Sequence, residues 1–458
     1  MSLAQDSVET IRQIMVGDSD RQRTLRAALA AFAVRVLSAA IAYFSQAILA
    51  RWMGSHQYGA FVFVWVWVLI LGGVSSLGLN IAMMRFVPDL RERGDLDGLR
   101  GLLLGGRLFV LAMATLVAGL GLGGLWLFAD RLGSHYVLPA YLALFCIPAY
   151  ALTDIQDGIG RARQWIGVGL LPPYVLRPLL ILAATVAACL LGAPMTASTA
   201  AGAAIIATWT TACVQLMLLR RELRRELPDG PHTYRLGAWL KTALPILMIT
   251  GFDLAVQNTD VMFLSIYWSA SDVGIYFAGL KTMSLIAFVH YAVASASANQ
   301  FAALAARGSR EEIARLAQET VRWTFWPSAA GAVAILVLGR PLLWLFGPEF
   351  TVAYGPMFVL ALGLLCKSAV GPAEYLLNML GEQKACGGVL IFTAALNVVL
   401  NYLLVPSYGL YGAAASTAAT LAVAAVLYGV LVWRRLGIDM TIWGAMRATP
   451  SPAIASPT

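Results

Sequence analysis

The sequence predicts an all-α integral membrane protein whose twelve transmembrane helices form two six-helix parallel repeats around a central cavity. The first supporting observation is a run without charge over residues 60–84, AFVFVWVWVLILGGVSSLGLNIAMM. About 20 apolar residues are enough for a helix to cross the roughly 30 Å hydrocarbon layer. The whole chain is 59% hydrophobic and 12% charged, whereas soluble domains are about 25% charged. The other two observations are the distribution of positive charge and a similarity between the two halves.

Similar apolar runs recur to the end of the chain, and each is long enough for one passage. Two of them are irregular. The fourth carries Asp154 and Asp157 near its end, and the fifth begins with Pro172 and Pro173, which we expect to kink it. The expected spans are 27–50, 60–84, 101–128, 138–158, 168–191, 197–219, 240–266, 275–303, 323–345, 356–380, 388–405 and 411–433.

Positive charge predicts the orientation of these spans. With the N-terminus inside, 24 of the 32 Lys and Arg residues lie in cytoplasmic segments. Outside loops and edges hold only Arg51, Arg131 and Arg340. Because Lys and Arg accumulate on the cytoplasmic side, we expect both termini in the cytoplasm. The positive charge is spread over many short loops, which argues against a nucleic acid as partner.

The longest polar connection inside the bundle separates six spans from six. The five cysteines show no spacing typical of a zinc site or a disulfide framework. We expect the tail, which ends in Pro, Ser and Ala, to be disordered. The predicted segments are a cytoplasmic N-terminal segment 1–26, an N-terminal six-helix lobe 27–219, a basic cytoplasmic linker 220–239, a C-terminal six-helix lobe 240–433 and a cytoplasmic tail 434–458.

The two halves of the chain resemble each other. GSHQYGAF (54–61) follows the first span and SASDVGIYF (269–277) follows the seventh, so that Gly59 aligns with Gly274. Each half has an even number of spans, so both halves enter the membrane from the same side. This is a parallel repeat, related by an axis along the membrane normal, and two such halves enclose a central cavity.

Short motifs in a fixed order resemble a known family. ARWMGSHQYGAF (50–61) and GLNIAMMRFVPDLRERGD (78–95) are similar to the N-terminal signature of polysaccharide-exporting flippases of the Wzx type. NTDVMFLSIYWSASDVGIYFAGLK (258–281) resembles the start of their second half, and LLNMLGEQK (376–384) and PSYGLYGAAASTAAT (406–420) resemble later connections. These flippases belong to the MOP superfamily, with the lipid II flippases and the MATE drug exporters.

The resemblance implies a transport function. Such proteins move an undecaprenyl-diphosphate-linked oligosaccharide from the cytoplasmic to the periplasmic leaflet by alternating access. The glycan serves O-antigen (lipopolysaccharide), capsule or exopolysaccharide biosynthesis. The resemblance also implies a multi-pass protein of the cell inner membrane, with polysaccharide polymerase and chain-length machinery as partners. No bond is made or broken, so we expect no enzyme activity, no cofactor and no metal.

A diphosphate that crosses a bilayer needs cations inside the membrane, where a charged side chain is by default a functional hypothesis. On the first span Arg35, Ser38 and Gln46 fall on one polar stripe. Arg35 also matches the cavity-facing arginines of lipid II flippases, although it could instead snorkel to the interface. Arg85, at the cytoplasmic end of the second span, could meet the incoming phosphate or could be a topology anchor.

Three further cations within predicted spans are candidates for the cavity or for internal pairs. Lys281 could receive the diphosphate late in transport, or it could snorkel outward. Arg177 and Lys367 lie deeper, and for these two we favour a structural pairing with an acid such as Glu374 or Asp154.

Three polar residues share one face of the seventh span, because Asp253, Gln257 and Asp260 are spaced by four and three residues. Asp260 matches an acidic position that is common in this family. The three residues could balance the cavity cations, or they could bind a coupling proton or sodium ion. Burial would raise the pKa of a carboxyl group and ion pairing would lower it, so both roles stay open.

Three rival functions make different predictions. A MATE-like cation or drug antiporter should have a cavity dominated by carboxylates. A membrane glycosyltransferase or polysaccharide polymerase should have a sizeable extracytoplasmic loop, whereas the outside loops expected here are short. A permease for a small solute should have helices interrupted at corresponding positions of the two halves, and the sequence shows no clean pair of such interruptions.

Overall fold

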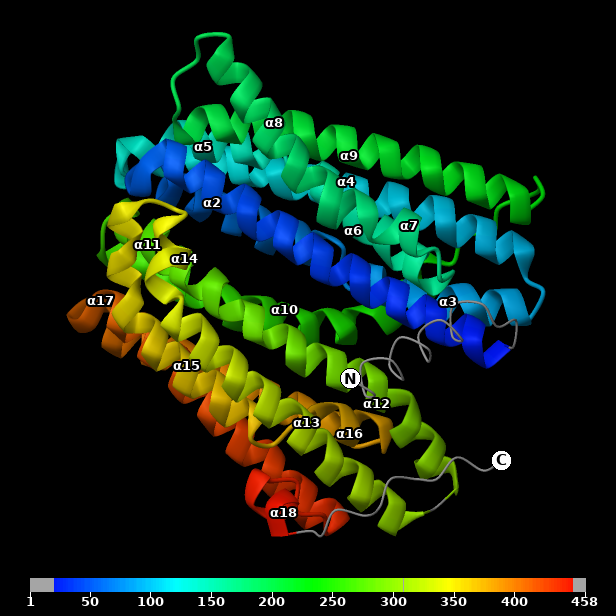
Figure 1. The fold of residues 1–458 in the computed structure, drawn as a ribbon. Helices are drawn as coiled ribbons and strands as arrows, with labels where there is room; N and C mark the ends of the chain where they lie inside the picture. Colours follow the sequence, from blue (N-terminus) through cyan, green and yellow to red (C-terminus); the bar gives the residue numbers. More distant parts are fainter. Residues whose placement is uncertain (1–19, 308, 448–458) are drawn as a thin grey trace, which may run out of the picture.

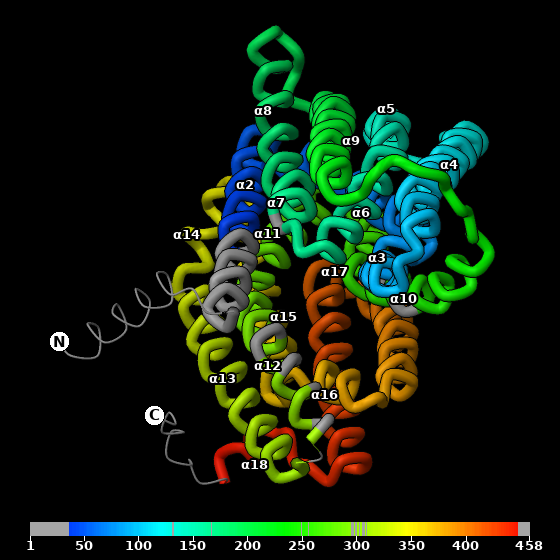
Figure 2. The backbone as a smooth tube through the Cα atoms, turned by 90° about the vertical axis from the view of Figure 1, so that its right-hand side faces the viewer, coloured from blue at the N-terminus to red at the C-terminus, as the bar shows by residue number. Residues whose placement is uncertain are grey.

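The computed structural model describes residues 20–307 and 309–447, and within them every regular element is a helix. The helices form two lobes, one from each half of the chain (Figures 1 and 2). We call the end of the molecule where α9 and α12 terminate the linker end, because the connection between the lobes begins there. α12 and α13 diverge from α3 and α9 toward this end (Figure 1).

The N-terminal lobe contains, in chain order, α2 (Asp20–Ser75), α3 (Leu79–Glu92), α4 (Leu96–Phe128), η1 (Ala129–Arg131), α5 (Ser134–Leu144), α6 (Ile147–Ala162), α7 (Ile166–Gly169), the π-helical segment η2 (Pro172–Leu176), α8 (Arg177–Leu190) and α9 (Ala197–Glu226). The C-terminal lobe contains α10 (Leu236–Tyr267), α11 (Ala270–Met283), η3 (Ser284–Ile286), α12 (Ala287–Arg307), α13 (Arg310–Val337), α14 (Gly339–Trp344), η4 (Pro348–Ala353), α15 (Tyr354–Ser368), α16 (Ala373–Met379), α17 (Gln383–Leu436) and α18 (Ile442–Arg447).

Two of the longest helices are hairpins that fold back at a glycine. α2 turns at Gly54 (φ 73°) and α17 at Gly409 (φ 53°), in backbone conformations that favour glycine. The Tyr58 hydroxyl donates to the Gln46 side chain at 2.9 Å, although 12 residues of straight helix would separate their backbones by about 18 Å. In α17 the Asn397 amide lies 3.3 Å from the Thr420 hydroxyl, 23 residues away. Each hairpin therefore supplies two passages.

The passages agree with most of the prediction. Among the described residues, seven helices are long and apolar enough to cross a membrane, or nine if each of two bent pairs is one span. Two of these nine candidates are the hairpins α2 and α17, and each hairpin crosses twice. The nine candidates therefore make eleven passages. α13 is 28 residues long and corresponds to the predicted ninth span, although it lies outside this set of candidates.

Several helices are interrupted at corresponding positions of the two halves, contrary to the prediction. The second passage breaks between α2 and α3 and the eighth at η3, while the fourth breaks between α5 and α6 and the tenth between α15 and α16. Gly78 (φ 77°) stands at the break between α2 and α3, and Gly371 (φ 56°) with Pro372 at that between α15 and α16. Neither Ser284 nor Phe145 is a helix breaker, so composition reveals only one member of each pair. The interrupted pairs are what a two-fold repeat predicts.

Two boundaries also differ from the prediction. The ninth span was expected at 323–345, but its helix runs from Arg310 to Val337, since its charged first turns precede the apolar part. The tail expected to be disordered from 434 continues as helix to Leu436 and includes α18. The Ile442 amide donates to the Ala369 carbonyl at 2.8 Å, and Ile442 is buried against the C-terminal lobe. Residues 448–458 and 1–19 lie outside the described part of the chain.

The lobes meet along α10, where a Cβ atom at Gly78 would be 2.3 Å from the Ala243 carbonyl oxygen, and at the end opposite the linker. Gly59 of α2 lies so close to α11 that a Cβ atom there would be 1.7 Å from the Ala270 carbonyl oxygen and 2.8 Å from the Gly274 nitrogen. The contact therefore joins backbone to backbone. Around it, Arg51 donates to the Trp344 carbonyl at 2.9 Å, and the Ser55 amide donates to Glu349 at 3.3 Å. These contacts close the opposite end of the space between the lobes.

Candidate functional site: a cationic cavity between the lobes

A cavity of about 370 Å³ lies between the two lobes. Its walls come from both limbs of the α2 hairpin and from η2 and α8 on one side, and from α11, η3 and α12 on the other. Most lining side chains are apolar or aromatic. Its charged lining residues are Arg177 and Lys281, one from each lobe, and none of the lining residues is an acid.

Arg177 enters the cavity directly after a π-helical segment. Its guanidinium lies 4.7 Å from the centre of the Tyr150 ring and 5.9 Å from that of Trp65. Such contacts stabilise a cation without neutralising it. No described residue accepts a hydrogen bond from its five N–H groups, although such donors are normally satisfied. A π-turn shifts the register of the helix that follows and is often found at functional sites. Arg177 has no acid within 4 Å among the described residues, but it acts electrostatically on Asp154, one of the two acids considered for its pairing.

Lys281 faces the same cavity from the C-terminal lobe. Its ammonium nitrogen is 4.9 Å from the centre of the Phe277 ring. Within the described part of the chain, it has no hydrogen bond or ion pair with an acid. Asp154 acts on Arg177 and Asp260 acts on Lys281 electrostatically, but neither acid lines the cavity. Two intramembrane cations, one on each lobe and with no acid beside them in the lining, make the cavity a place where an anion would be stabilised.

Neutral polar groups lie beside the two cations. Gln46 lines the cavity, and its side-chain oxygen accepts the hydrogen bond from Tyr58. The hydroxyl groups of Tyr43 and Thr282 lie 3.1 Å apart across the lobe interface. The Tyr43 ring also packs edge-on against Phe346 at 5.3 Å. This polar and aromatic layer separates the cavity from the closed end of the molecule.

The other predicted cations are not in the cavity lining. Arg85 lies on α3 and is exposed. Arg35 belongs to α2, three residues before the cavity-lining Ser38, but its side chain lies outside the described residues. Lys367 lies 4.0 Å from Glu374, at an ion-pair distance.

The three polar residues of α10 do not share one environment. The helix bends by 49° between its segments Leu236–Leu254 and Val256–Tyr267. Asp253 is exposed and accepts a hydrogen bond from Gln257 at 2.6 Å. Asp260 is 2% exposed and accepts from the Tyr276 hydroxyl at 2.5 Å and from Thr417 at 3.1 Å. The bend explains why helical spacing alone did not separate them.

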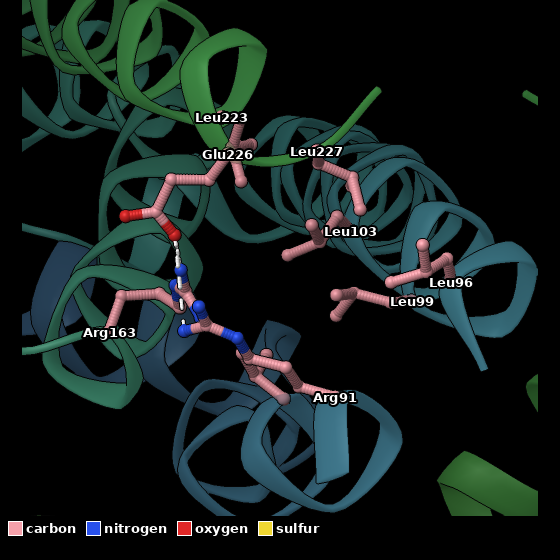
Figure 3. Close-up of a pocket in the computed structure, with 9 residues that line it drawn as sticks. Arg91, Leu96, Leu99, Leu103, Arg163, Leu223, Glu226 and Leu227 are labelled. Atoms are coloured by element: carbon pink, nitrogen blue, oxygen red, sulfur yellow. Dashed lines mark ion pairs between the residues drawn. The ribbon is translucent and has the colours of Figure 1, made fainter. Parts of the chain in front are cut away.

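A second, much smaller pocket of about 40 Å³ lies at the linker end of the N-terminal lobe (Figure 3). Glu226 of α9 forms ion pairs with Arg163 and with Arg91, the latter at 4.0 Å. Burial, and to a lesser degree the neighbouring Arg91, lower the pKa of Arg163. The pocket is too small for a ligand of the size of a sugar, and its charges tie α3, α6 and α9 together.

Comparison with known proteins identifies the class of the fold. The structure superposes on an inward-facing multidrug resistance MATE family transporter with a TM-score of 0.72 and 14% identity, over 87% of this chain and 94% of that one. It superposes on the lipid II flippase MurJ in an inward closed conformation with a TM-score of 0.70 and 15% identity, over 88% and 87%. The chain therefore has the fold of the MOP-superfamily transporters.

The comparison of sequences finds a relative that is named as a flippase. The chain is 25% identical over 170 residues to the probable low-salt glycan biosynthesis flippase Agl15 of Haloferax volcanii. This match covers 37% of the present chain and 36% of that protein. No protein-family model matches the chain. The resemblance that the motifs indicated, to flippases of the MOP superfamily, is confirmed.

Proposed function

We propose that the protein flips an undecaprenyl-diphosphate-linked oligosaccharide from the cytoplasmic to the periplasmic leaflet of the inner membrane, for O-antigen, capsule or exopolysaccharide biosynthesis. The linker end faces the cytoplasm in this proposal, in agreement with the positive charge of the linker. The lobes alternate between opening to the linker end and opening to the opposite end. The relative from Haloferax volcanii supports the glycan part of the proposal.

The composition of the cavity is the observation that carries the proposal. Arg177 and Lys281 line it without a close ion pair among the described residues, and no carboxylate is part of its lining; Asp154 and Asp260 act on them only from outside the lining. Arg can bind a diphosphate through two parallel N–H contacts, while Lys acts as a point charge. The aromatic lining offers apolar faces beside the two cations. An anionic headgroup is therefore the cargo that this cavity would stabilise.

The same observation disfavours an organic cation as cargo. A cation would meet two positive charges without a carboxylate in the lining. The interrupted helices, by contrast, do not distinguish a small-solute permease from a flippase, because both arise from repeats of this kind. We assign Asp260 the role of a buried counter-charge in the C-terminal lobe, and Arg35 and Arg85 the role of guiding the diphosphate toward the cavity.

Binding of purified protein to undecaprenyl diphosphate tests the proposal. Arg177→Gln and Lys281→Gln should each weaken this binding about 10- to 150-fold, since a hydrogen bond to a charged group contributes about 1.5–3 kcal/mol. Lys384→Gln is the matched control, because Lys384 is exposed and outside the cavity. Uncharged undecaprenol should bind equally to all four proteins.

Two results would contradict the proposal. One is equal affinity of wild type and both cavity variants for undecaprenyl diphosphate. The other is tight binding of an organic cation such as tetraphenylphosphonium without binding of the diphosphate, which would favour the antiporter.

A further inference from the structure

Two arginines lie on α4 and α9, one helical turn beyond the small pocket of Figure 3. Leu103 of α4 and Leu223 of α9 line this pocket. Arg107 follows Leu103 by four residues and Arg220 precedes Leu223 by three, so each arginine shares the helix face of its leucine. The two helices run in opposite directions, because α4 begins at the linker end and α9 terminates there. Both arginines therefore lie on the same side of the pocket, away from the linker end.

The two arginines are close enough to repel each other. Arg220 acts on Arg107 electrostatically, and like charges at short range disfavour each other. Nε of Arg107 donates to the Leu103 carbonyl at 2.6 Å. Within the described part of the chain, neither guanidinium group forms an ion pair, because the acids of both helices pair with other arginines. These pairs are Asp97 with Arg100, Glu222 with Arg225, and Glu226 with Arg163 and Arg91.

Both arginines lie where the hydrocarbon layer of a membrane would end. On α4, Arg107 precedes Trp126 by 19 residues, or about 29 Å. Trp126 is 76% exposed, and exposed tryptophan is typical of a membrane interface. On α9, Arg220 follows the first helical residue, Ala197, by 23 residues, or about 35 Å. Because the hydrocarbon layer is roughly 30 Å thick, the two guanidinium groups fall at the level of the lipid phosphates in the leaflet at the linker end.

The surroundings of the pair suit a phospholipid. Leu108 and Met217, which are 56% and 68% exposed, flank the two arginines and offer apolar contacts to acyl chains. A guanidinium group binds phosphate through parallel N–H contacts. Basic sites between transmembrane helices at the cytoplasmic surface are known to bind the headgroups of anionic lipids. The pair therefore combines a charge that fits a lipid phosphate with an apolar face that fits its chains.

We propose that Arg107 and Arg220 together bind the phosphate of an anionic phospholipid in the leaflet at the linker end. The bound phosphate attracts both helices and so replaces the repulsion between α4 and α9. Neither arginine is part of the lining of the central cavity. The inference therefore goes beyond the proposed function and does not depend on the cargo.

A fluorophore on Cys213 can detect the lipid at this site, in a background without the other four cysteines. Cys213 is exposed and precedes Arg220 by seven residues, which places it two turns away on the same face of α9. The protein is placed in bilayers of phosphatidylcholine that contain increasing fractions of a lipid with brominated chains, which quench the fluorophore. Half of the quenching should need a smaller fraction of brominated phosphatidylglycerol, which is anionic, than of brominated phosphatidylcholine.

Substitutions test which charges cause this preference. Arg107→Gln and Arg220→Gln should each reduce the preference about five-fold, which is the contribution of one arginine near an anionic lipid surface. Arg221→Gln is the matched control, because Arg221 is exposed, carries the same charge and points about 100° away around the helix. It should keep the preference. Arg107→Lys should keep most of it, because lysine retains the positive charge.

Thermal unfolding in the same bilayers gives a second measurement. Without anionic lipid, Arg107→Gln should unfold at the same temperature as the wild type or higher, because the repulsion is removed. Phosphatidylglycerol should raise the unfolding temperature of the wild type more than that of the variant. Equal quenching of the wild type by both lipids, or an equal loss of preference in Arg220→Gln and Arg221→Gln, would overturn the proposal. Displacement of phosphatidylglycerol by dissolved inorganic phosphate at matched ionic strength would also overturn it, since the ligand would then be a soluble anion.

Discussion

Replacement of Gly59 by alanine should open the end of the molecule where the lobes meet. In the structure, a Cβ atom at Gly59 would lie 1.7 Å from the Ala270 carbonyl oxygen, whereas real Cβ contacts are essentially never under 3.0 Å. The obstructing atoms are backbone, so no side chain can rotate away. The two lobes must therefore separate by more than about 1 Å at this end, or the variant must accept a strained contact.

The size of the effect follows from the cost of overpacking. Forcing an extra carbon into a packed interface costs about 1–3 kcal/mol, which changes the ratio of two conformations about 5- to 150-fold. Only the conformation with the lobes in contact carries this cost. The Gly59→Ala variant should therefore shift toward the state that is open at the opposite end and closed at the linker end.

Spin labels at Arg93→Cys and Arg310→Cys measure this shift as a shorter distance between the linker ends. Gly202→Ala in α9 is the control, because no atom lies within 4 Å of a Cβ built there. Both substitutions gain about 0.8–1.0 kcal/mol of helix propensity, so the propensity effect cancels in the comparison. A distance distribution of Gly59→Ala equal to that of Gly202→Ala would refute the claim that the backbone contact holds this end closed.

Two further predictions concern export and topology. Arg35→Ala should leave the amount of protein in the membrane near normal but reduce glycan export in a strain that lacks this gene. Arg35→Lys should restore export partly, because Lys keeps the charge without the planar fork. Full export with alanine would remove Arg35 from the mechanism. A reporter fused after Arg435 should report the cytoplasm, because an even number of passages precedes it, and a periplasmic signal there would contradict twelve spans.

The general fold could be predicted from the sequence because membrane burial leaves an unmistakable pattern. A helix that crosses the bilayer must be apolar along its length, so the run at 60–84 was evident without an alignment. The turn at Gly54 was also foreseeable, since a glycine between two apolar runs suits a tight reversal. Gly59, in contrast, serves close approach of the two lobes, which no local pattern reveals.

The candidate site was less predictable, for two physical reasons. Face assignments rest on a helix period of 3.6 residues, and the π-helical segment at Pro172–Leu176 breaks that period just before Arg177. The bend in α10 likewise separates Asp253 from Asp260. The contact of Lys367 with Glu374 was predictable because the two residues lie seven positions apart in one passage. The contact of His290 with Glu374 was not predictable in this way, since more than 70 positions separate the two residues.

The two cavity cations lie on different lobes. The electrostatic force between the lobes therefore depends on whether the cavity is occupied. When the cavity is empty, Arg177 and Lys281 repel each other across it and favour lobes that stand apart. Under the proposed function, a bound diphosphate would attract both, so that the same two side chains would then draw the lobes together. Loading and closing would in this way be one electrostatic event, and release of the cargo on the far side would restore the repulsion that reopens the transporter.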